Sequence, residues 1–231
     1  MHITNRELRL IADHQAKQRS ERSLMRAAIA IILRDGANGT EFLLMQRAQH
    51  KDDPWSGQMS FPGGKIDPQD KSAKQAAMRE ALEEVGIELL NHDYVGQLDD
   101  LYGLKVDNQY SVHISCFVFK PKGELTPIGN YEVADLVWLP FSYLNDPANA
   151  CEYYHPADAK VRMPAVLVDA NKEQILWGLS LRMLLSLYEL LAWPMLVVSS
   201  QDNKIIKQID NRNMDSSKLD SITRSLIERS N

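Results

Sequence analysis

Cysteine is scarce in this sequence. Only Cys116 and Cys151 occur among 231 residues, far apart and in no C-x-x-C or histidine-flanked arrangement. This spacing offers neither a zinc site nor a disulfide framework that can be read from sequence. Cys116 lies in the apolar stretch 113–119, where a cysteine is typically a small buried side chain. We therefore expect two reduced thiols.

The sequence also lacks a recognisable targeting or membrane segment. Residues 1–7 contain no basic region followed by an apolar one, so no signal peptide is predicted and a cytoplasmic protein is expected. The most apolar long segment, 175–193, contains Arg182 and Glu189 and falls short of the roughly 20 apolar residues that a bilayer requires. We interpret it as a core helix that ends near Pro194, with Leu176, Leu179, Met183, Leu187 and Leu190 at helical spacing.

Positive charge is not in excess. Lys and Arg total 26 against 31 Asp and Glu, a formal net charge of −5, and no basic block is long enough to follow a nucleic-acid backbone. Nucleic-acid and membrane partners are therefore not expected. With 44% hydrophobic and 25% charged residues, the composition is that of a globular protein. An acidic protein that handles a phosphorylated substrate is expected to recruit divalent cations, because like charges repel.

Hydrophobic patterning predicts strands and helices in alternation, which indicates an α/β protein. Thr4 and Glu7 match a capping box for a helix to about Gln18. The apolar runs 26–33 and 41–46 flank a turn-rich segment and predict a hairpin. Further strands are predicted at 94–98, 113–119 and 133–139, with a short strand pair after Leu196 and a helix over 217–228.

A second capping box predicts the helix of greatest interest. Ser72 and Gln75 would begin it, and Gly86 stands where a glycine ends helices after Val85. The preceding segment, 50–68, is rich in Asp, Pro, Trp, Ser and Gly and is predicted to be a loop. Loops of this kind commonly carry function.

Three glutamates of this helix, Glu80, Glu83 and Glu84, are predicted to share one face, opposite Met78 and Leu82. A solvated face would usually interleave lysines, whereas like charges one turn apart destabilise a helix. A hard cation such as Mg²⁺ resolves the repulsion, since it is commonly held by one or two carboxylates and substrate phosphates. The plainer interpretation, a solvated surface, stays open on these residues alone.

These residues belong to a longer pattern, Gly64-x5-Asp70-x8-Arg79-Glu80-Ala81-Leu82-Glu83-Glu84-Val85-Gly86-Ile87. It resembles the Nudix box, G-x5-E-x7-R-E-U-x-E-E-x-G-U, with Asp70 in place of the first glutamate and one extra residue before Arg79. The resemblance implies the Nudix fold, an α/β/α sandwich with a mixed β-sheet, over residues 26–195. Residues 1–25 would then be an N-terminal helical extension and 196–231 a C-terminal extension packed on the domain.

The same resemblance implies a hydrolase of nucleoside diphosphates linked to another moiety, dependent on Mg²⁺ or Mn²⁺. Glu80, Glu83 and Glu84 would be metal ligands. Glu83 would alternatively act as the base that deprotonates water, and Arg79 would hold the carboxylates in register. Glu84 and Arg79 thereby join Glu83 as predicted catalytic residues.

Two neighbouring segments resemble the coenzyme A pyrophosphatase subgroup of the Nudix family: Phe61-Pro62-Gly63-Gly64-Lys65 and Leu43-Leu44-x-x-Arg47-Ala48. They imply hydrolysis of CoA or acyl-CoA to 3′,5′-ADP and (acyl-)4′-phosphopantetheine, with Arg47, Gly63, Gly64 and Lys65 binding substrate. Asp52 replaces an arginine expected in this subgroup, and Gly57 lies one position late. The alternatives are a Nudix pyrophosphatase for ADP-ribose, dinucleotides or nucleoside triphosphates, and a non-catalytic nucleotide-binding sensor.

Residues outside the Nudix-box pattern indicate function less specifically. Glu132 resembles an acid that faces the metal site in the later strand of the Nudix fold, and an ordinary edge-strand acid is an equal expectation. Trp177 and Gly178 resemble the start of a helix in CoA-type members, and Tyr153 or Tyr154 would border a nucleobase or pack at the surface. A homodimer is a further expectation for the parts outside the resemblance.

Overall fold

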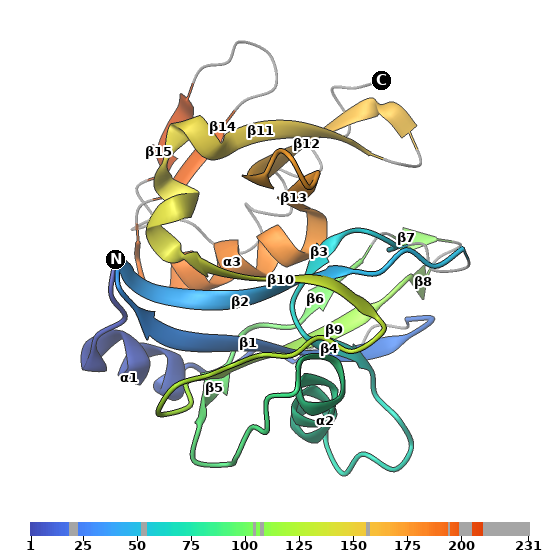
Figure 1. Cartoon of the computed structure of the whole chain (residues 1–231), viewed down its shortest axis with the longest axis vertical. Helices are drawn as coiled ribbons and strands as arrows, with labels where there is room; N and C mark the ends of the chain where they lie inside the picture. Colours follow the sequence, from blue (N-terminus) through green and yellow to red (C-terminus); the bar gives the residue numbers. More distant parts are fainter. Residues whose placement is uncertain are drawn as a thin grey trace. The chain divides into compact units, whose positions relative to one another are not determined.

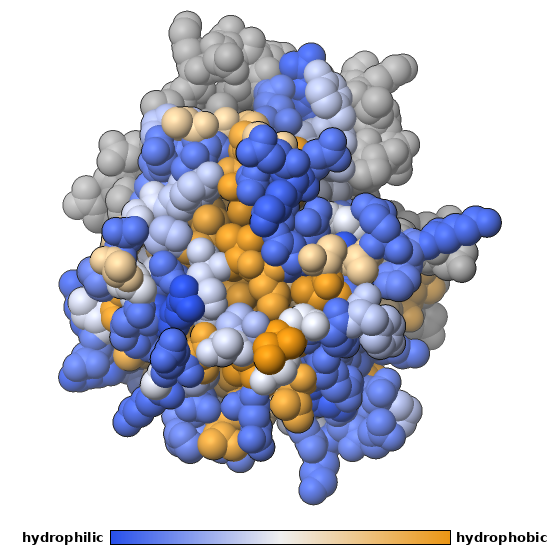
Figure 2. Space-filling view, viewed as in Figure 1, coloured by the Kyte–Doolittle hydropathy of each residue, from blue (hydrophilic) through white to orange (hydrophobic). Residues whose placement is uncertain are grey.

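A computed structural model describes residues 1–18, 23–51, 55–103, 105–106, 109–155, 158–193, 195–198 and 205–209. The chain forms two compact units, Met1–Phe141 and Ser142–Asn231. The boundaries predicted at residues 25 and 195 stay a prediction. Polar and charged residues cover most of the surface seen in Figure 2, as the composition leads one to expect.

The first unit is built on a mixed sheet with the strand order β10-β2-β1-β9-β5 (Figure 1). β1 runs parallel to β9 and antiparallel to β2, and its last residue, Gly36, pairs with Gly39 across the turn. The predicted hairpin and the three further strands are therefore confirmed. The main strands are β1 (Arg26–Gly36), β2 (Gly39–Arg47), β5 (Tyr94–Gln97), β9 (His113–Phe119) and β10 (Val133–Pro140).

Short strands complete this unit. β3 (Met59–Ser60) pairs with β2, β4 (Gly63–Lys65) with β1, and β6 (Leu101–Tyr102) with β9, while β7 (Lys105–Val106) and β8 (Gln109–Tyr110) form a separate pair. The segment 50–68, predicted as a loop, thus contains two short strands. β4 lies antiparallel to β1, and this pairing fixes the position of the glycine pair at 63–64.

Helix α2 (Ala73–Val85) packs on one face of the sheet, which is the helix–sheet layering of the predicted α/β fold (Figure 1). Its contact residues are small: Ala76, Ala77 and Ala81 are fully buried in one cluster with Ala28 and Phe117. Small side chains let a helix approach its neighbour closely. The helix backbone therefore lies near β1 and β4.

The ends of α2 follow the prediction with one correction. Ser72 Oγ accepts the N–H of Gln75 at 3.1 Å, and Gly86 closes the helix in the left-handed region at φ 66°. The reciprocal half of the capping box is displaced by one residue, because Gln75 Oε1 accepts the N–H of Lys71 at 2.8 Å rather than that of Ser72. The N–H of Gln75, in the first turn of the helix, and that of Lys71, just before it, therefore both have acceptors.

The N-terminal helix α1 (Asn5–Asp13) has the predicted capping box between Thr4 and Glu7 and ends before Gln18. Ile11, its one buried residue, lies against β5. A Cβ on Gly96 of β5 would stand 2.3 Å from the Ile11 carbonyl oxygen, so this glycine permits the close contact. Cys116, on β9, is buried as predicted.

The second unit contains a three-stranded antiparallel sheet, helix α3 and a strand pair. Its elements are η1 (Phe141–Asn145, which begins in the first unit), η2 (Pro147–Asn149), β11 (Ala150–His155), β12 (Asp158–Asp169), β13 (Gln174–Trp177), α3 (Gly178–Leu190), β14 (Met195–Val198) and β15 (Ile205–Ile209). Within the described residues, no helix combines the length and apolar character needed to cross a bilayer.

The long helix predicted from residue 175 begins later than expected. Leu176 is fully buried but belongs to β13, and Gly178, at φ 60°, turns the chain from strand into helix. A short apolar run such as 175–177 fits a strand as well as a helix. Periodicity alone therefore placed the start of the helix too early. The predicted strand pair after residue 195 is confirmed, and the helix predicted over 217–228 lies outside the described residues.

Candidate active site

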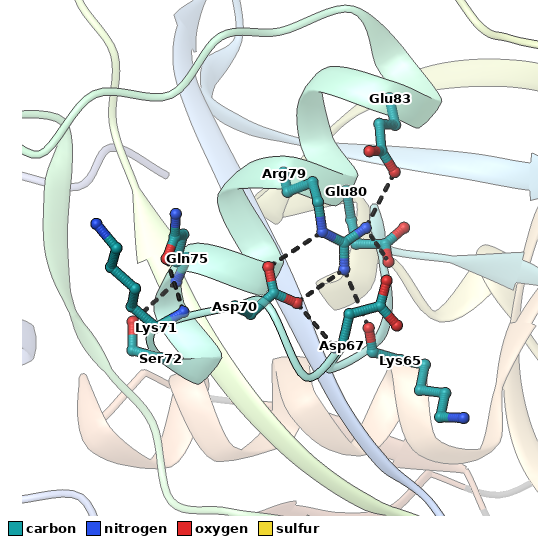
Figure 3. A network of polar contacts seen from close by, with 9 residues as sticks. All are labelled: Lys65, Asp67, Asp70, Lys71, Ser72, Gln75, Arg79, Glu80 and Glu83. Carbon is teal, nitrogen blue, oxygen red and sulfur yellow. Dashed lines mark hydrogen bonds and ion pairs between the residues drawn. The ribbon is translucent and has the colours of Figure 1, made fainter.

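Arg79, in the middle of α2, contacts three carboxylates (Figure 3). Its Nε and Nη2 donate to the two oxygens of Asp70 at 3.1 and 3.0 Å. Nη1 donates to Glu80 Oε1 at 2.9 Å and to Glu83 Oε2 at 3.0 Å, and Nη2 also donates to the Lys65 carbonyl at 3.1 Å. One guanidinium thus links the helix acids to the loop that precedes the helix.

Asp70 is the anchor of this network. Its side chain is 3% exposed, and its Oδ2 also accepts the N–H of Asp67 at 2.8 Å. The hydrogen bonds from Arg79 hold the pKa of Asp70 below its ordinary value. The aspartate, together with the extra residue before Arg79, therefore still supplies a bidentate partner for the arginine.

The lowered pKa of Asp70 predicts an effect on acid stability. A carboxyl whose folded-state pKa lies below its unfolded value stabilises the protein above the unfolded pKa, and this contribution is lost as pH falls through the folded pKa. We expect Asp70→Asn to flatten the acid side of the curve of unfolding free energy against pH, measured by urea denaturation. Asp13→Asn, at an exposed carboxyl, is the control; equal curves for wild type and Asp70→Asn would contradict the assignment.

Glu84 is buried, with 3% of its surface exposed, and it points toward the sheet side of α2. Its Oε2 accepts the N–H of Gly63 at 2.8 Å. Burial raises the pKa of Glu84 to about 8; the Gly63 N–H acts against this rise and the charge of Glu80 adds to it. Burial likewise raises the pKa of Glu80 above its ordinary value, with Arg79 opposing.

The three predicted metal ligands differ in burial. Arg79 Nη1 donates to both Glu80 and Glu83, so these two side chains lie on neighbouring parts of the helix surface. Glu80 and Glu84, one turn apart, lie on the side of the buried alanines, whereas the Glu83 side chain is 55% exposed. Leu82, predicted on the apolar stripe, is also exposed. Residues seven or eight positions apart share a helix face, so Ala76 and Ala77 place Glu84 on the packed side, and the prediction that the glutamates lie opposite that side was wrong for Glu84.

The glycines of β4 make this arrangement possible. Gly64 pairs with Ala28 of β1, and a Cβ on Gly64 would lie 2.7 Å from Glu80 Oε1. Gly63 has φ 153°, and a Cβ there would meet the Ala28 carbonyl oxygen at 2.4 Å. The absence of side chains therefore lets the backbone of β4 lie directly against the partly buried Glu80 and the buried Glu84.

Two further residues approach from the sheet edge. Arg47, at the end of β2, has Nη1 3.9 Å from Glu84 Oε1. The next residue, Ala48, donates its N–H to the Glu132 carbonyl at 2.7 Å, and the charge of Glu132 contributes to the raised pKa of both Glu80 and Glu84. Glu132 was left undecided by the sequence; a strand pairing between distant segments places it here.

The other predicted substrate residue, Lys65, contributes its carbonyl to Arg79, while its side chain extends away from the guanidinium (Figure 3). Asp52, where the CoA subgroup has arginine, lies outside the described residues. The structure therefore brings Arg47, Gly63 and Gly64 together with Glu80 and Glu84, and leaves the Lys65 side chain exposed to solvent.

A NUDIX domain model matches residues 24–160, more than half of the chain. This chain belongs to the Nudix family. It is 32% identical over 146 residues to the uncharacterized Nudix hydrolase NudL of Pectobacterium atrosepticum, covering 61% of this chain and 70% of that protein. A probable Nudix hydrolase of Schizosaccharomyces pombe is 27% identical over 157 residues, covering 67% of this chain and 52% of the relative.

The Nudix chain thus spans about half the length of that yeast relative, and 32% of a second S. pombe protein to which it is 39% identical over 106 residues. Among solved structures, a MutT/nudix family protein from Enterococcus faecalis aligns with a TM-score of 0.50 at 15% identity, covering 94% of this chain and 84% of that one. The predicted Nudix fold with a mixed sheet and helices is confirmed.

The Nudix glutamates fit a hard divalent cation by their chemistry. Glu80 and Glu84 present carboxylate oxygens in a site where burial penalises their negative charge, and Gly64 leaves room beside Glu80. Within the described part of the chain, no three His, Cys, Asp or Glu side chains stand close enough to hold a metal by themselves. A cation held by two carboxylates would draw its remaining ligands from water and phosphate oxygens, as Mg²⁺ commonly does.

Replacing Gly64 or Gly63 of the Nudix chain with alanine should have different effects on activity and stability. In Gly64→Ala the nearest atoms to the new Cβ are those of the Glu80 carboxylate, a side chain that can move, so we expect reduced metal-dependent activity with little loss of stability. In Gly63→Ala it meets backbone atoms at a positive φ, so we expect the free energy of unfolding to fall by about 2 kcal/mol. Urea denaturation and kcat/KM measure the two effects; the reverse pattern would contradict this packing.

Proposed function

We propose that this protein is a metal-dependent hydrolase that cleaves the diphosphate linkage of CoA or acyl-CoA, giving 3′,5′-ADP and 4′-phosphopantetheine or its acyl derivative. The observation that carries the proposal is the pair of desolvated carboxylates beside the glycines of β4: Glu84 accepts the Gly63 N–H, and Glu80 accepts a hydrogen bond from Arg79. Hydrolysis of nucleoside diphosphate derivatives is the broader function that this arrangement supports.

Glu80 and Glu84 would hold Mg²⁺ or Mn²⁺. A divalent cation, when bound, neutralises the diphosphate and lowers the pKa of water at the site. The Gly63 N–H fixes one oxygen of Glu84, and Arg79 fixes one oxygen each of Glu80 and Glu83. Both contacts restrict side-chain rotation, so the carboxylates are oriented before substrate arrives.

Glu83 is suited to a different part of the reaction. Its carboxylate is half exposed, so water reaches it, and its bond to Arg79 limits the directions in which it can accept a proton. A base that takes a proton from water needs this combination of access and orientation. We assign Glu83 as the proton acceptor.

The choice of CoA rests on the segments around Arg47 and Gly63. The Arg47 guanidinium lies beside Glu84 at the end of β2, where a cation can meet phosphate oxygens bidentately. Asp52, which stands where the CoA subgroup has an arginine, favours the alternative substrates: ADP-ribose, dinucleotides or nucleoside triphosphates. With an aspartate at this position, the 3′-phosphate of CoA would lack a cationic partner.

One assay separates these possibilities. The purified protein with Mg²⁺ or Mn²⁺ is incubated with CoA, acetyl-CoA, ADP-ribose, NADH, diadenosine polyphosphates and nucleoside triphosphates, and the products are identified by mass spectrometry. Preferential release of 3′,5′-ADP from CoA supports the proposal. Preference for another substrate retains the broader hydrolase function only, and inactivity with both metals favours a nucleotide-binding sensor.

A further inference from the structure

The segment 128–132 sits on the C-terminal end of α2. The N–H of Ile128 donates to the Val85 carbonyl and that of Asn130 to the Glu84 carbonyl, both at 2.9 Å. These carbonyls belong to the last turn of the helix, where no intrahelical donor remains. The Asn130 side chain in turn accepts the N–H of Glu132 at 2.8 Å. The helix that carries the acids therefore also positions this segment.

A second set of contacts ties the same segment to the sheet. The Glu132 carbonyl accepts the N–H of Ala48 at 2.7 Å, immediately after Arg47 at the end of β2. Tyr131 thus lies between Asn130, which donates to the Glu84 carbonyl, and Glu132, which accepts the N–H of the residue after Arg47. It lies at the rim of the candidate active site, and its backbone is held on both sides.

The Tyr131 side chain is open to solvent along its ring, with 79% of the residue exposed. The neighbouring Glu132 carboxylate raises the pKa of Tyr131. An exposed aromatic ring on a fixed backbone offers its face to a flat ligand.

We propose that Tyr131 is a specificity-determining residue, on whose ring the base of a nucleoside diphosphate stacks while the diphosphate lies at Glu80, Glu84 and Arg47. This inference rests on the proposed function for the position of the diphosphate. Stacking accepts any base, because every base has a π-face. Tyr131 would therefore favour base-bearing diphosphates over base-free ones without selecting among bases.

The test compares binding of ADP with binding of inorganic pyrophosphate, both with Mg²⁺, by isothermal titration calorimetry. Tyr131→Ala is expected to raise the Kd for ADP roughly tenfold and to leave the Kd for pyrophosphate unchanged. Tyr131→Phe keeps the ring and should bind ADP like wild type. Ile128→Ala, an exposed apolar residue on the same segment, is the matched control and should change neither Kd.

Three results would overturn the inference: no change of the ADP Kd in Tyr131→Ala, an equal loss for pyrophosphate, or Tyr131→Phe behaving like Tyr131→Ala, which would assign the effect to the hydroxyl. Failure of the proposed function is distinguishable. If wild type hydrolyses no substrate while Tyr131→Ala still weakens ADP alone, stacking stands and hydrolysis falls. If wild type hydrolyses nucleotides and the ADP Kd is insensitive to Tyr131, hydrolysis stands and stacking falls.

Discussion

Replacing Glu84 with glutamine is expected to lower kcat/KM roughly 100- to 1,000-fold while the protein stays folded, since a catalytic cation contributes several kcal/mol to the transition state. Glutamine has nearly the same shape and keeps an oxygen that can accept the Gly63 N–H. What it removes is the charge that would bind the cation. Glu88→Gln, the same change at an exposed glutamate just beyond the end of α2, is the matched control.

Glu84→Gln should also change how the free energy of unfolding depends on pH when metal is removed by a chelator. The pKa of Glu84 is raised from 4.5 to about 8 in the folded protein, so folded chains bind this proton more tightly than unfolded ones. The resulting stabilisation is present at low pH and is lost as pH rises through about 8. Glu84→Gln should remove this slope from the curve of unfolding free energy against pH, whereas Glu88→Gln should retain it.

Either of two results would count against this role of Glu84. Wild-type kcat/KM in Glu84→Gln with saturating Mg²⁺ would remove the residue from the reaction. An unchanged pH slope in the chelated variant would show that burial of this carboxylate does not control its titration. The two readouts are independent, because one needs metal and the other excludes it.

Arg79→Ala is expected to lower the free energy of unfolding by about 3 kcal/mol, because it leaves the buried Asp70 carboxylate without its bidentate partner. The substitution also removes the hydrogen bonds that Arg79 donates to Glu80 and Glu83. Because residues that orient metal ligands affect activity in this way, we expect kcat/KM to fall roughly 10- to 100-fold as well. Urea denaturation and steady-state kinetics measure the two losses. Arg6→Ala, at an exposed arginine of α1, is the control.

A double-mutant cycle separates charge burial from loss of packing. Asp70→Asn removes the negative charge that Arg79 neutralises, so adding it to Arg79→Ala should restore part of the lost stability without restoring activity. Strictly additive effects would show that the two side chains do not depend on each other, contrary to the hydrogen bonds between them.

Local patterns in the sequence predicted the elements that carry the site. The hairpin of β1 and β2 and the ends of α2 depend on neighbouring residues: two apolar runs around a turn, a capping serine, and a glycine that tolerates positive φ. Arg79 and its acids were found through their spacing. Such signals lie within a few residues, which is why the sequence was sufficient for them.

Features that depend on tertiary packing were not predicted. The glutamates were predicted on the face opposite the packed side, but the alanines that pack on the sheet turn Glu84 inward and leave Glu83 exposed. Glu132 reaches the site only through the pairing of its backbone with Ala48, far away in the sequence. Periodicity did not reveal the start of α3 at Gly178, which has a positive φ, whereas the resemblance around Trp177 and Gly178 had indicated a helix start there.

We propose that Glu80 and Glu84 form a cation-dependent centre for diphosphate hydrolysis. The most direct test of this centre is mass spectrometry of CoA incubated with metal-stripped protein before and after addition of Mg²⁺ or Mn²⁺. We expect 3′,5′-ADP and 4′-phosphopantetheine to appear only after a metal is added, and not with Glu84→Gln. Absence of cleavage of CoA and of every other nucleoside diphosphate derivative with both metals would contradict it.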